Sequence, residues 1–374
     1  MKTSTSKRLR WNVAIWLAAG LFMTGTAGMA AGPIMPDPKA EARHQPQVEE
    51  TANGIPLVNI TAPSSGGVSR NEYETFNVPD KGAILNNSYT LSKTELAGYV
   101  QGNSNMAERP AKIIVNEVTG AGPTSMDGFL EVAGNRADVV IANPNGITVN
   151  GGGFINTGKA FLTTGKPVYD GEDHLQRFDI TGGDILIEGK GLGGKETGSL
   201  AILSRAVKIN AGIWAKDLHI TTGANSIDAK TLEASAIEGK GGHPAFALDT
   251  AAIGGMYAGR ITLVGTEKGL GVNNSGTWSA EDNLTLDWNG DLKNSGTIYS
   301  KGNTDLRTSR LENDKTIAAE RNLSAAAKEN IRNQGKLLAG ENMDIYAGKT
   351  LDNAGHAMES GNNLSIETGD TVNN

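Results

Sequence analysis

Histidines and carboxylates are the side chains in this sequence that could support acid–base or metal chemistry. None of the five histidines has the HExxH spacing that places two metal ligands on one face of a helix. They are scattered along the chain: His44, His174, His219, His243 and His356. We therefore expect each of them to be a surface or loop residue, and we expect no metal site and no cofactor.

Pairs of acidic residues could in principle serve a site that cleaves polysaccharides, because glycoside cleavage uses two carboxyl groups. Examples are Glu172 with Asp173, and Asp179 with Asp184. Charged residues make up 20% of the chain, so acidic neighbours arise by chance and no ordered cluster stands out. The glycine-rich run Gly189–Gly194 lacks the GxxxxGK[ST] spacing of a phosphate loop and is interpreted as a turn. We expect that the chain is not an enzyme.

The composition favours many short strands over a thick globular core. Hydrophobic residues make up 38% of the chain and aromatic residues only 5%, whereas there are 49 glycines. Short clusters of Val, Ile and Leu, such as Lys112–Val115 and Asp184–Ile187, recur too regularly for a disordered chain. Turn-forming residues follow nearly every cluster. The sequence therefore predicts an all-β fold.

The first thirty residues have the pattern of a secretory signal peptide. An apolar stretch, Trp11–Met23, is followed by the small residues Ala27–Ala30. The basic residues that precede it are Lys2, Lys7, Arg8 and Arg10. A membrane anchor is disfavoured, because the apolar stretch is shorter than the roughly 20 residues that a spanning helix needs. We expect residues 1–30 to be removed after Ala30.

Cleavage there would change the formal charge from −7 to about −11, since four basic residues and no acidic residue are lost. This acidity argues against nucleic acid or an anionic membrane as the main partner. The following segment, residues 31–53, contains four prolines and many charges without a sustained apolar period. It predicts a mobile leader or a loosely attached cap.

The last hundred residues contain a repeat of 19 to 21 residues, marked by an apolar residue, any residue and Asn. The first anchors are Val272–Asn274, Leu292–Asn294, Leu311–Asn313, Ile331–Asn333, Leu351–Asn353 and Val372–Asn374. A second anchor begins with Asn283, Asn303, Asn322, Asn342 and Asn363. One unit cannot bury its few aliphatic residues alone, so stacked units of a solenoid are expected. Strands at about 3.3 Å per residue suit a triangular coil, with the Asn amides bonded along the axis at the corners.

Two segments could also form helix. Lys230–Glu238 could form two helical turns or an irregular excursion. Ala318–Glu329 is rich in helix formers, but the Asn register continues through it and favours strand.

The stretch Ala137–Val149 predicts a strand, a tight turn and a second strand. Pro144 presets φ for a turn, and Gly146 permits a conformation that side chains disfavour. The local pattern fits either a hairpin or one coil of a parallel β-solenoid. The downstream repeat favours the coil.

Six motifs, in order, resemble the N-terminal two-partner secretion (TPS) domain of filamentous haemagglutinin-like exoproteins, including the stick-like toxins of contact-dependent growth inhibition. The motifs are Asn71–Val78, Ile114–Val118, Ile141–Ile147, Gly182–Asp184, Ala211–Trp214 and Gly254–Arg260. The resemblance covers residues 54–276, and residues 277–374 resemble the start of that family's haemagglutinin repeats.

This resemblance implies an all-β, right-handed parallel β-helix with extra-helical strands or hairpins and an N-terminal cap. The family is typified by two Asn-Pro-Asn motifs. The residues that fit the second motif are Asn143, Pro144, Asn145, Gly146 and Ile147. The first falls on Asn103, Asn105 and Met106, where Ser104 replaces proline and Met106 replaces leucine. The Ser104 replacement is expected to loosen that turn. Each motif either makes a corner or is also read by a transporter.

The implied partner is an outer-membrane β-barrel transporter with periplasmic domains. The expected function is secretion targeting and folding nucleation for a large exoprotein. That exoprotein would pass through the periplasm to the outer surface or surroundings of a Gram-negative bacterium, for adhesion or contact-dependent toxin delivery. One alternative is an adhesin fragment that itself binds a receptor on a host or neighbouring cell. The other is a β-helical polysaccharide lyase, which rests on analogy of fold alone.

Overall fold

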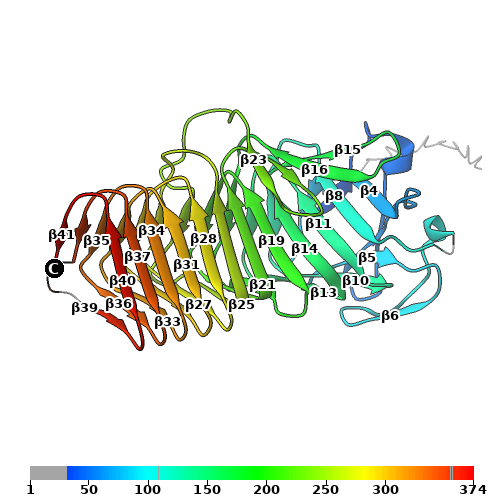
Figure 1. Cartoon of the computed structure of the whole chain (residues 1–374). Coiled ribbons are helices and arrows are strands. Elements are labelled where there is room, and N and C mark those ends of the chain that lie inside the picture. Colours follow the sequence, from blue (N-terminus) through cyan, green and yellow to red (C-terminus); the bar gives the residue numbers. More distant parts are fainter. Residues whose placement is uncertain (1–31, 108, 354, 356) are drawn as a thin grey trace, which may run out of the picture. The chain divides into compact units, whose positions relative to one another are not determined.

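Short parallel strands, three in each coil, build a β-solenoid (Figure 1). The computed structural model describes residues 32–374 except 108, 354 and 356. The predicted signal peptide and its cleavage residue Ala30 lie outside the described residues. Within the described part there is no α-helix, only the short 3-10 turns η1 (Ala42–His44) and η2 (Ser104–Met106). The predicted all-β parallel β-helix is confirmed.

One row of strands forms an 11-stranded parallel sheet. It contains β9 (Thr124–Met126), β12 (Ile147–Val149), β17 (Asp184–Ile187), β20 (Ala206–Ile209), β24 (Leu248–Thr250), β26 (Val272–Asn274), β29 (Leu292–Asn294), β32 (Leu311–Asn313), β35 (Ile331–Asn333), β38 (Leu351–Asp352) and β41 (Val372–Asn373). The repeat anchors of the sequence are the strands of this row.

The other two sides of each coil belong to one large sheet, and we call them the second and third rows. The second row contains β3 (Pro56–Asn59), β5 (Ala83–Asn87), β10 (Phe129–Gly134), β13 (Gly152–Ile155), β18 (Leu192–Gly194), β27 (Thr277–Ala280), β30 (Thr297–Ser300), β33 (Thr316–Ala319), β36 (Lys336–Ala339) and β39 (Ala357–Ser360). The third row contains β4 (Val68–Phe76), β8 (Ile113–Val118), β11 (Ala137–Ala142), β14 (Thr157–Thr163), β19 (Ser199–Ser204), β28 (Leu284–Trp288), β31 (Thr304–Thr308), β34 (Leu323–Ala327), β37 (Met343–Ala347) and β40 (Leu364–Thr368). The long strands β21 (Gly212–Thr222) and β25 (Gly255–Gly265) span both rows.

Antiparallel additions lie outside the coils. A four-stranded sheet contains β15 (Lys166–Tyr169), β16 (Leu175–Ile180), β22 (Asn225–Asp228) and β23 (Ala234–Ala236). A two-stranded hairpin contains β6 (Ser92–Thr94) and β7 (Gly98–Val100). Of the two segments with helical character, Lys230–Glu238 contributes β23, and Ala318–Glu329 contributes β34. Pairing with neighbouring strands overrides helix propensity there.

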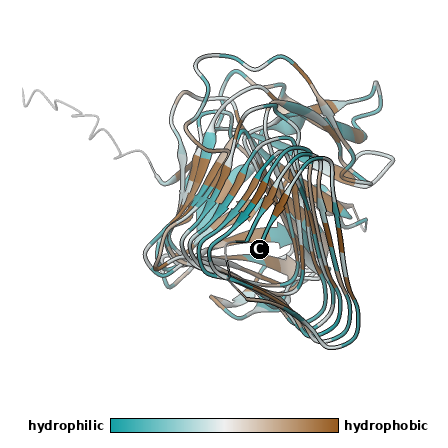
Figure 2. Cartoon of the chain, turned by 60° about the vertical axis from the view of Figure 1, so that its left-hand side comes forward, coloured by the Kyte–Doolittle hydropathy of each residue, from teal (hydrophilic) through white to brown (hydrophobic). Residues whose placement is uncertain are grey.

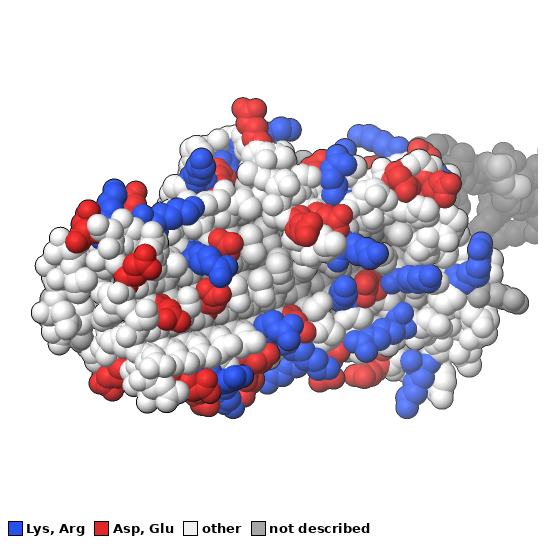
Figure 3. Space-filling view, viewed as in Figure 1, with Lys and Arg blue, Asp and Glu red and all other residues white. Residues whose placement is uncertain are grey.

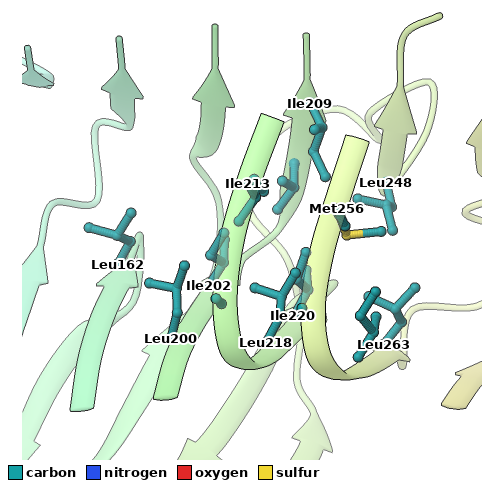
Figure 4. Packing of buried hydrophobic residues seen from close by; sticks show 14 of the residues in the cluster. Leu162, Leu200, Ile202, Ile209, Ile213, Leu218, Ile220, Leu248, Met256 and Leu263 are labelled. Atoms are coloured by element: carbon teal, nitrogen blue, oxygen red, sulfur yellow. The ribbon is translucent and has the colours of Figure 1, made fainter. Parts of the chain in front are cut away.

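The interior of the coils is a continuous column of aliphatic side chains. Alternate residues of each strand point inward, so Leu292, Leu311 and Ile331 lie in register in successive coils. Figure 2, which looks partly along the coil axis, shows hydrophobic bands that pass from coil to coil. Figure 4 shows Leu200, Ile202 and other members of this cluster directed into the space between the strands. Each coil therefore covers apolar surface of the next.

Asparagines close two corners of the repeating coils, and those of the first corner are buried. In the first ladder, Nδ2 of each Asn donates to Oδ1 of the Asn in the next coil, at 2.7–2.8 Å. Its members are Asn274, Asn294, Asn313, Asn333 and Asn353, all 1% exposed or less. In the second ladder the direction reverses, since Asn342 donates to Asn322 at 2.9 Å and Asn322 to Asn303 at 3.0 Å. The predicted amide ladders along the axis are confirmed.

Of the two alternatives for residues 31–53, a mobile leader or an attached cap, the described part has the strand pairing of a cap. β1 (Ile34–Pro36) pairs antiparallel with β4, and β2 (Gln47–Glu50) pairs antiparallel with β3. The segment thus forms the N-terminal cap that the resemblance implied. Its prolines are compatible with this, because an edge strand needs fewer backbone donors than a central one.

Charged side chains hold this segment to the coils, and we call them the N-terminal charged cluster: Arg43, His44, Arg70, Glu72, Glu117, Tyr169 and Asp173. His44 Nδ1 lies 3.1 Å from Glu72 Oε1, and Arg43 Nη1 lies 2.7 Å from Asp173 in the β15–β16 connection. Arg70 lies 2.8 Å from Glu72 and places its guanidinium 4.3 Å from the centre of the Tyr169 ring. These partners are far away in the sequence, so composition alone could not show the attachment.

The first ladder generates a stability prediction. Asn313→Ala removes the amide between Asn294 and Asn333, which leaves buried polar groups without one of their partners. We expect the free energy of opening this region to fall by about 1–3 kcal/mol. Hydrogen exchange of the β32 and β35 amides measures it. Asn363→Ala, at an exposed position, is the matched control and should change stability by less than about 0.5 kcal/mol. Equal losses of stability in the two variants would contradict the prediction that the buried Asn contributes more than the exposed one.

The N-terminal charged cluster generates a pH prediction. Burial raises the pKa of Glu117 above its ordinary 4.5, Glu72 adds to the rise, and Arg70 and Lys166 oppose it. The folded state therefore binds the proton of Glu117 more tightly than the unfolded state does, so the contribution of this residue to stability falls as the pH rises above about 4.5. The unfolding free energy of the unaltered chain minus that of Glu117→Gln should decrease from acid to neutral pH in urea titrations. An increase over that range would contradict this assignment.

Candidate functional site

The corner at Asn143 lies between β11 and β12 and is built by its side-chain amide. Asn143 is fully buried, and its Oδ1 accepts the backbone N–H of Asn145 at 2.9 Å. Its Nδ2 donates to Gly122 O and Thr124 Oγ1, both at 3.0 Å, in the preceding coil. One amide thus shapes its own turn and joins two coils.

The residues that follow complete the corner. Asn145 Nδ2 donates to Gly120 O at 2.8 Å, which adds a second bond to the preceding coil. Gly146 has a φ of +110° and donates its N–H to Asn143 O at 3.1 Å. An added Cβ at Gly146 would also lie 3.1 Å from Asp184 O in the next coil. Ile147 then enters the core with 2% exposure.

The corner at Asn103 has the same construction. Asn103 Oδ1 accepts the backbone N–H of Asn105 at 3.0 Å, and its Nδ2 donates to Ile60 O and Asn86 O at 2.9 Å. Asn105 Nδ2 donates to Ile60 O at 3.1 Å, and Met106 is buried in the core. Ser104 in place of proline leaves these bonds intact. The asparagines therefore define the corner.

Each corner has a buried and an exposed part. Asn103, Met106, Asn143 and Ile147 are buried, so in the folded chain they can act only on structure. The central residues, Ser104 in one corner and Pro144 and Asn145 in the other, are exposed. These central residues and the partly exposed Asn105 are the parts of the two corners that are available to a partner of the folded chain.

Of the described histidines, His44 is buried and differs from the expectation, whereas His219 is partly exposed. His44 is 4% exposed within the N-terminal charged cluster, and His219 lies on β21, where burial lowers its pKa to about 4. His174 lies 3.0 Å from Asp170, and His243 lies 2.9 Å from Glu267. His356 is outside the described residues. Within the described part of the chain, no group of three His, Cys, Asp or Glu residues could hold a metal ion.

The acidic pairs of the sequence take part in local contacts. Asp173 pairs with Arg43, and Asp179 accepts hydrogen bonds from Arg177 at 3.0 Å and Ser226 at 2.9 Å. Asp184 is exposed at the start of β17. Acidic and basic side chains are interspersed over the face shown in Figure 3.

Across residues 32–374, apart from the three left out, no helix is long and apolar enough to cross a membrane.

Sequence reasoning missed a line of aromatic side chains on the outer face of the second row. Phe129, Trp214, Tyr257 and Tyr299 lie on one ladder of paired residues, although they are distant in sequence. The available signal was a glycine two positions before an aromatic residue, as in Gly212–Trp214 and Gly255–Tyr257. Only the pairing of the coils shows that these residues are neighbours.

Comparison with known proteins identifies the family. Residues 33–298 match the model of the TPS secretion domain. The chain is 41% identical over 298 residues to "Toxin CdiA" of Yersinia pestis, and this alignment covers 74% of this chain and 9% of that protein. It is 39% identical over 323 residues to "16S rRNA endonuclease CdiA" of Enterobacter cloacae subsp. cloacae, and this alignment covers 86% of this chain and 10% of that protein.

A solved structure agrees with this. The crystal structure of the filamentous hemagglutinin secretion domain is 28% identical, with a TM-score of 0.64, and the alignment covers 90% of this chain and all of that one. The chain spans about a tenth of the length of the curated relatives, so the nuclease and toxin activities in their names belong to those much longer proteins. The matched region itself is a secretion domain and not a catalytic one. The chain belongs to the TPS secretion domain family of CdiA- and filamentous haemagglutinin-like exoproteins.

Proposed function

We propose that this chain targets a large exoprotein for secretion and nucleates its folding. An outer-membrane β-barrel transporter with periplasmic domains recognises the domain, and the remaining chain follows it to the cell surface or the surroundings of a Gram-negative bacterium. The observation that carries the proposal is the match of residues 33–298 to the TPS secretion domain. The names of the relatives, a toxin and an endonuclease, support toxin delivery as the purpose of the whole protein, with adhesion as the other candidate.

The structure of the first coil supports recognition before folding is complete. An extended segment can add to the edge of a partner's sheet only while its own edge is free. In the folded chain β1 covers the edge of β4, and β2 covers the edge of β3. The transporter would therefore bind these strands before the N-terminal cap docks.

The pairing of the coils supports folding that proceeds outward from the N-terminal end. Each row continues from one coil to the next, so a folded coil offers paired strands and apolar surface to the coil that follows. The contacts link residues about one coil apart, which keeps loop-closure entropy low. Burial of each new coil would supply direction to export without another energy source at that membrane.

Deletion of Asn71–Gly153 tests the secretion role. This segment contains both corners and most of β4, the partner of β1, so we expect the deleted protein to accumulate in the periplasm of cells that carry the transporter. Immunoblots of periplasm, cell surface and medium measure the distribution.

The matched control removes residues 314–333, one coil of the repeat, and joins Asn313 to Gln334 in the same register. We expect this control to be secreted, because each neighbouring coil retains an equivalent partner. Secretion of the Asn71–Gly153 deletion at the normal level would refute the proposal.

Substitutions at the second corner test whether it makes the turn or is read by the transporter. Asn143→Ala removes four side-chain hydrogen bonds and should lower the unfolding free energy by about 2–4 kcal/mol, with reduced secretion. Pro144→Ser reproduces the Asn-Ser-Asn order of the first corner and should change stability by less than about 1 kcal/mol. We expect its secretion to remain near normal.

The double change of Asn145 and Gly146 to valine extends this test, because valine strains the φ of +110° at position 146. We expect the purified double variant to fail to fold. The opposite result, a Pro144→Ser or double variant that folds but is not secreted, would show that the transporter reads the corner.

A further inference from the structure

We infer that the outer face of the second row is a binding site for a neutral glycan chain. The site is the aromatic ladder, defined as Phe129, Trp214, Tyr257 and Tyr299, with the small residues Gly153, Gly193 and Ser279 between them. This goes beyond the secretion role, because it concerns what the folded chain contacts after export.

The ladder is one continuous line along the coil axis. Phe129 pairs with Gly153, which pairs with Gly193 and then Trp214. Trp214 pairs with Tyr257, Tyr257 with Ser279, and Ser279 with Tyr299. Six strand spacings of about 4.8 Å make the ladder about 29 Å long. A linear ligand can therefore contact several aromatic rings at once.

The rings are accessible from solvent. Phe129 is 43% exposed and Tyr257 39% exposed, and Trp214 and Tyr299 are partly exposed. Buried residues flank each of them in the strand, such as Ile213 before Trp214 and Met256 before Tyr257. The aromatic residues thus point outward and contribute nothing to the core column.

Glycines shape the surface on which these rings lie. An added Cβ at Gly212 would come within 2.5 Å of the Trp214 ring, and one at Gly255 within 2.8 Å of the Tyr257 hydroxyl. An added Cβ at Gly153 would come within 2.4 Å of the Phe129 ring. The absence of side chains at these positions lets the rings lie close to the sheet. Side chains at these positions would displace them.

The central pair is fixed in a parallel arrangement. The Trp214 and Tyr257 ring centres are 6.1 Å apart, with an angle of 16° between their planes. Their other neighbours on the ladder, Gly193 and Ser279, are small and leave the outer sides of the pair open. An apolar face of a ligand can pack there at ordinary carbon–carbon distances of about 3.5–4.0 Å.

Polar groups run along both sides of the ladder. Thr277 and Thr297 lie two residues before Ser279 and Tyr299, and Glu281 and Lys301 lie two residues after them. Lys301 pairs with Glu281, and the Tyr299 hydroxyl donates to Glu320. Arg260 lies 3.5 Å from Asp217 and 3.7 Å from Asp282. Hydroxyls and ion pairs therefore border the apolar rings.

This combination fits a sugar chain. A pyranose ring has apolar C–H faces, which pack on aromatic rings, and hydroxyls at its edges, which hydrogen-bond to polar neighbours. Arg260, Glu281 and Lys301 beside the ladder are already paired with charges of opposite sign, so a neutral ligand suits this part of it better than an anionic or cationic polymer. An extended glycan also advances by nearly one strand spacing per sugar.

Two protein occupants fit less well. The strands of the second row are hydrogen-bonded on both sides, so they offer no free backbone edge to an extended peptide. A stripe one ring wide and about 29 Å long covers on the order of 200 Å², far below the roughly 800 Å² per partner of a stable dimer. The structure therefore favours the glycan.

Affinity electrophoresis of the purified chain tests the site. Gels contain hydroxyethyl cellulose, galactomannan or dextran as neutral probes, and heparin as the anionic probe. We expect retardation in at least one neutral gel and none specific to heparin. Trp214→Ala and Tyr257→Ala should each weaken the retardation about tenfold. Tyr346→Ala removes an equally exposed tyrosine from β37 and should have no effect.

Gly193→Val blocks the ladder without removing a ring. An added Cβ there has only ordinary contacts, the nearest at 3.7 Å, so the variant should fold. We expect it to bind the neutral probe more weakly than the unaltered chain does. Secretion of all four variants should be normal, which separates this inference from the proposed secretion role. The inference fails if no neutral probe retards the chain, if only heparin does, or if Tyr346→Ala weakens binding as much as Trp214→Ala. It also fails if sedimentation shows a dimer that Trp214→Ala abolishes.

Discussion

Hydrogen bonding from each coil to the next is the interaction on which the rest of this structure depends. A strand of three to six residues gains little stability alone, and here almost every strand has its partners in the coils before and after it. Buried asparagines at the corners restrict the register further, because a slip of one residue would leave their amides unpaired in the core. Asn103 and Asn143 in the secretion domain donate to backbone carbonyls of earlier residues, whereas each Asn of the first ladder in the repeats donates to the Asn of the next coil.

This constraint divides the side chains of each coil into groups with different tasks. Inward residues form the aliphatic column, corner asparagines join the coils, and outward residues that no additional strand covers have no part in the core. Phe129 and Tyr257 illustrate the third group, since they are exposed large aromatic residues on strands whose inward neighbours are fully buried. A surface function can therefore vary along this solenoid without change to its core.

The repeat architecture was predictable because its signal is local. The 20-residue spacing of Asn313 and Asn333 indicates both the length of a coil and the place of its corner, and the motif at Asn143–Ile147 marks a corner through its own local turn residues. Features that depend on distant partners were not predictable. The composition of residues 34–50 indicates no regular structure, yet Arg43 forms an ion pair with Asp173 and β1 pairs with β4. His44 is buried for the same reason. In the aromatic ladder, two successive aromatic residues, Phe129 and Trp214, are 85 positions apart in the sequence.

The opposed directions of the two asparagine ladders affect how far such a solenoid can extend. In a row of amides that all point the same way, dipoles add, as they do along an α-helix. Here the amides from Asn274 to Asn353 donate toward higher residue numbers, and those from Asn342 to Asn303 donate toward lower ones. Their fields oppose each other, so added coils do not build up a large axial dipole from the ladders. The corner chemistry of one coil thus places no electrostatic limit on the length of a fibre made by repeating it.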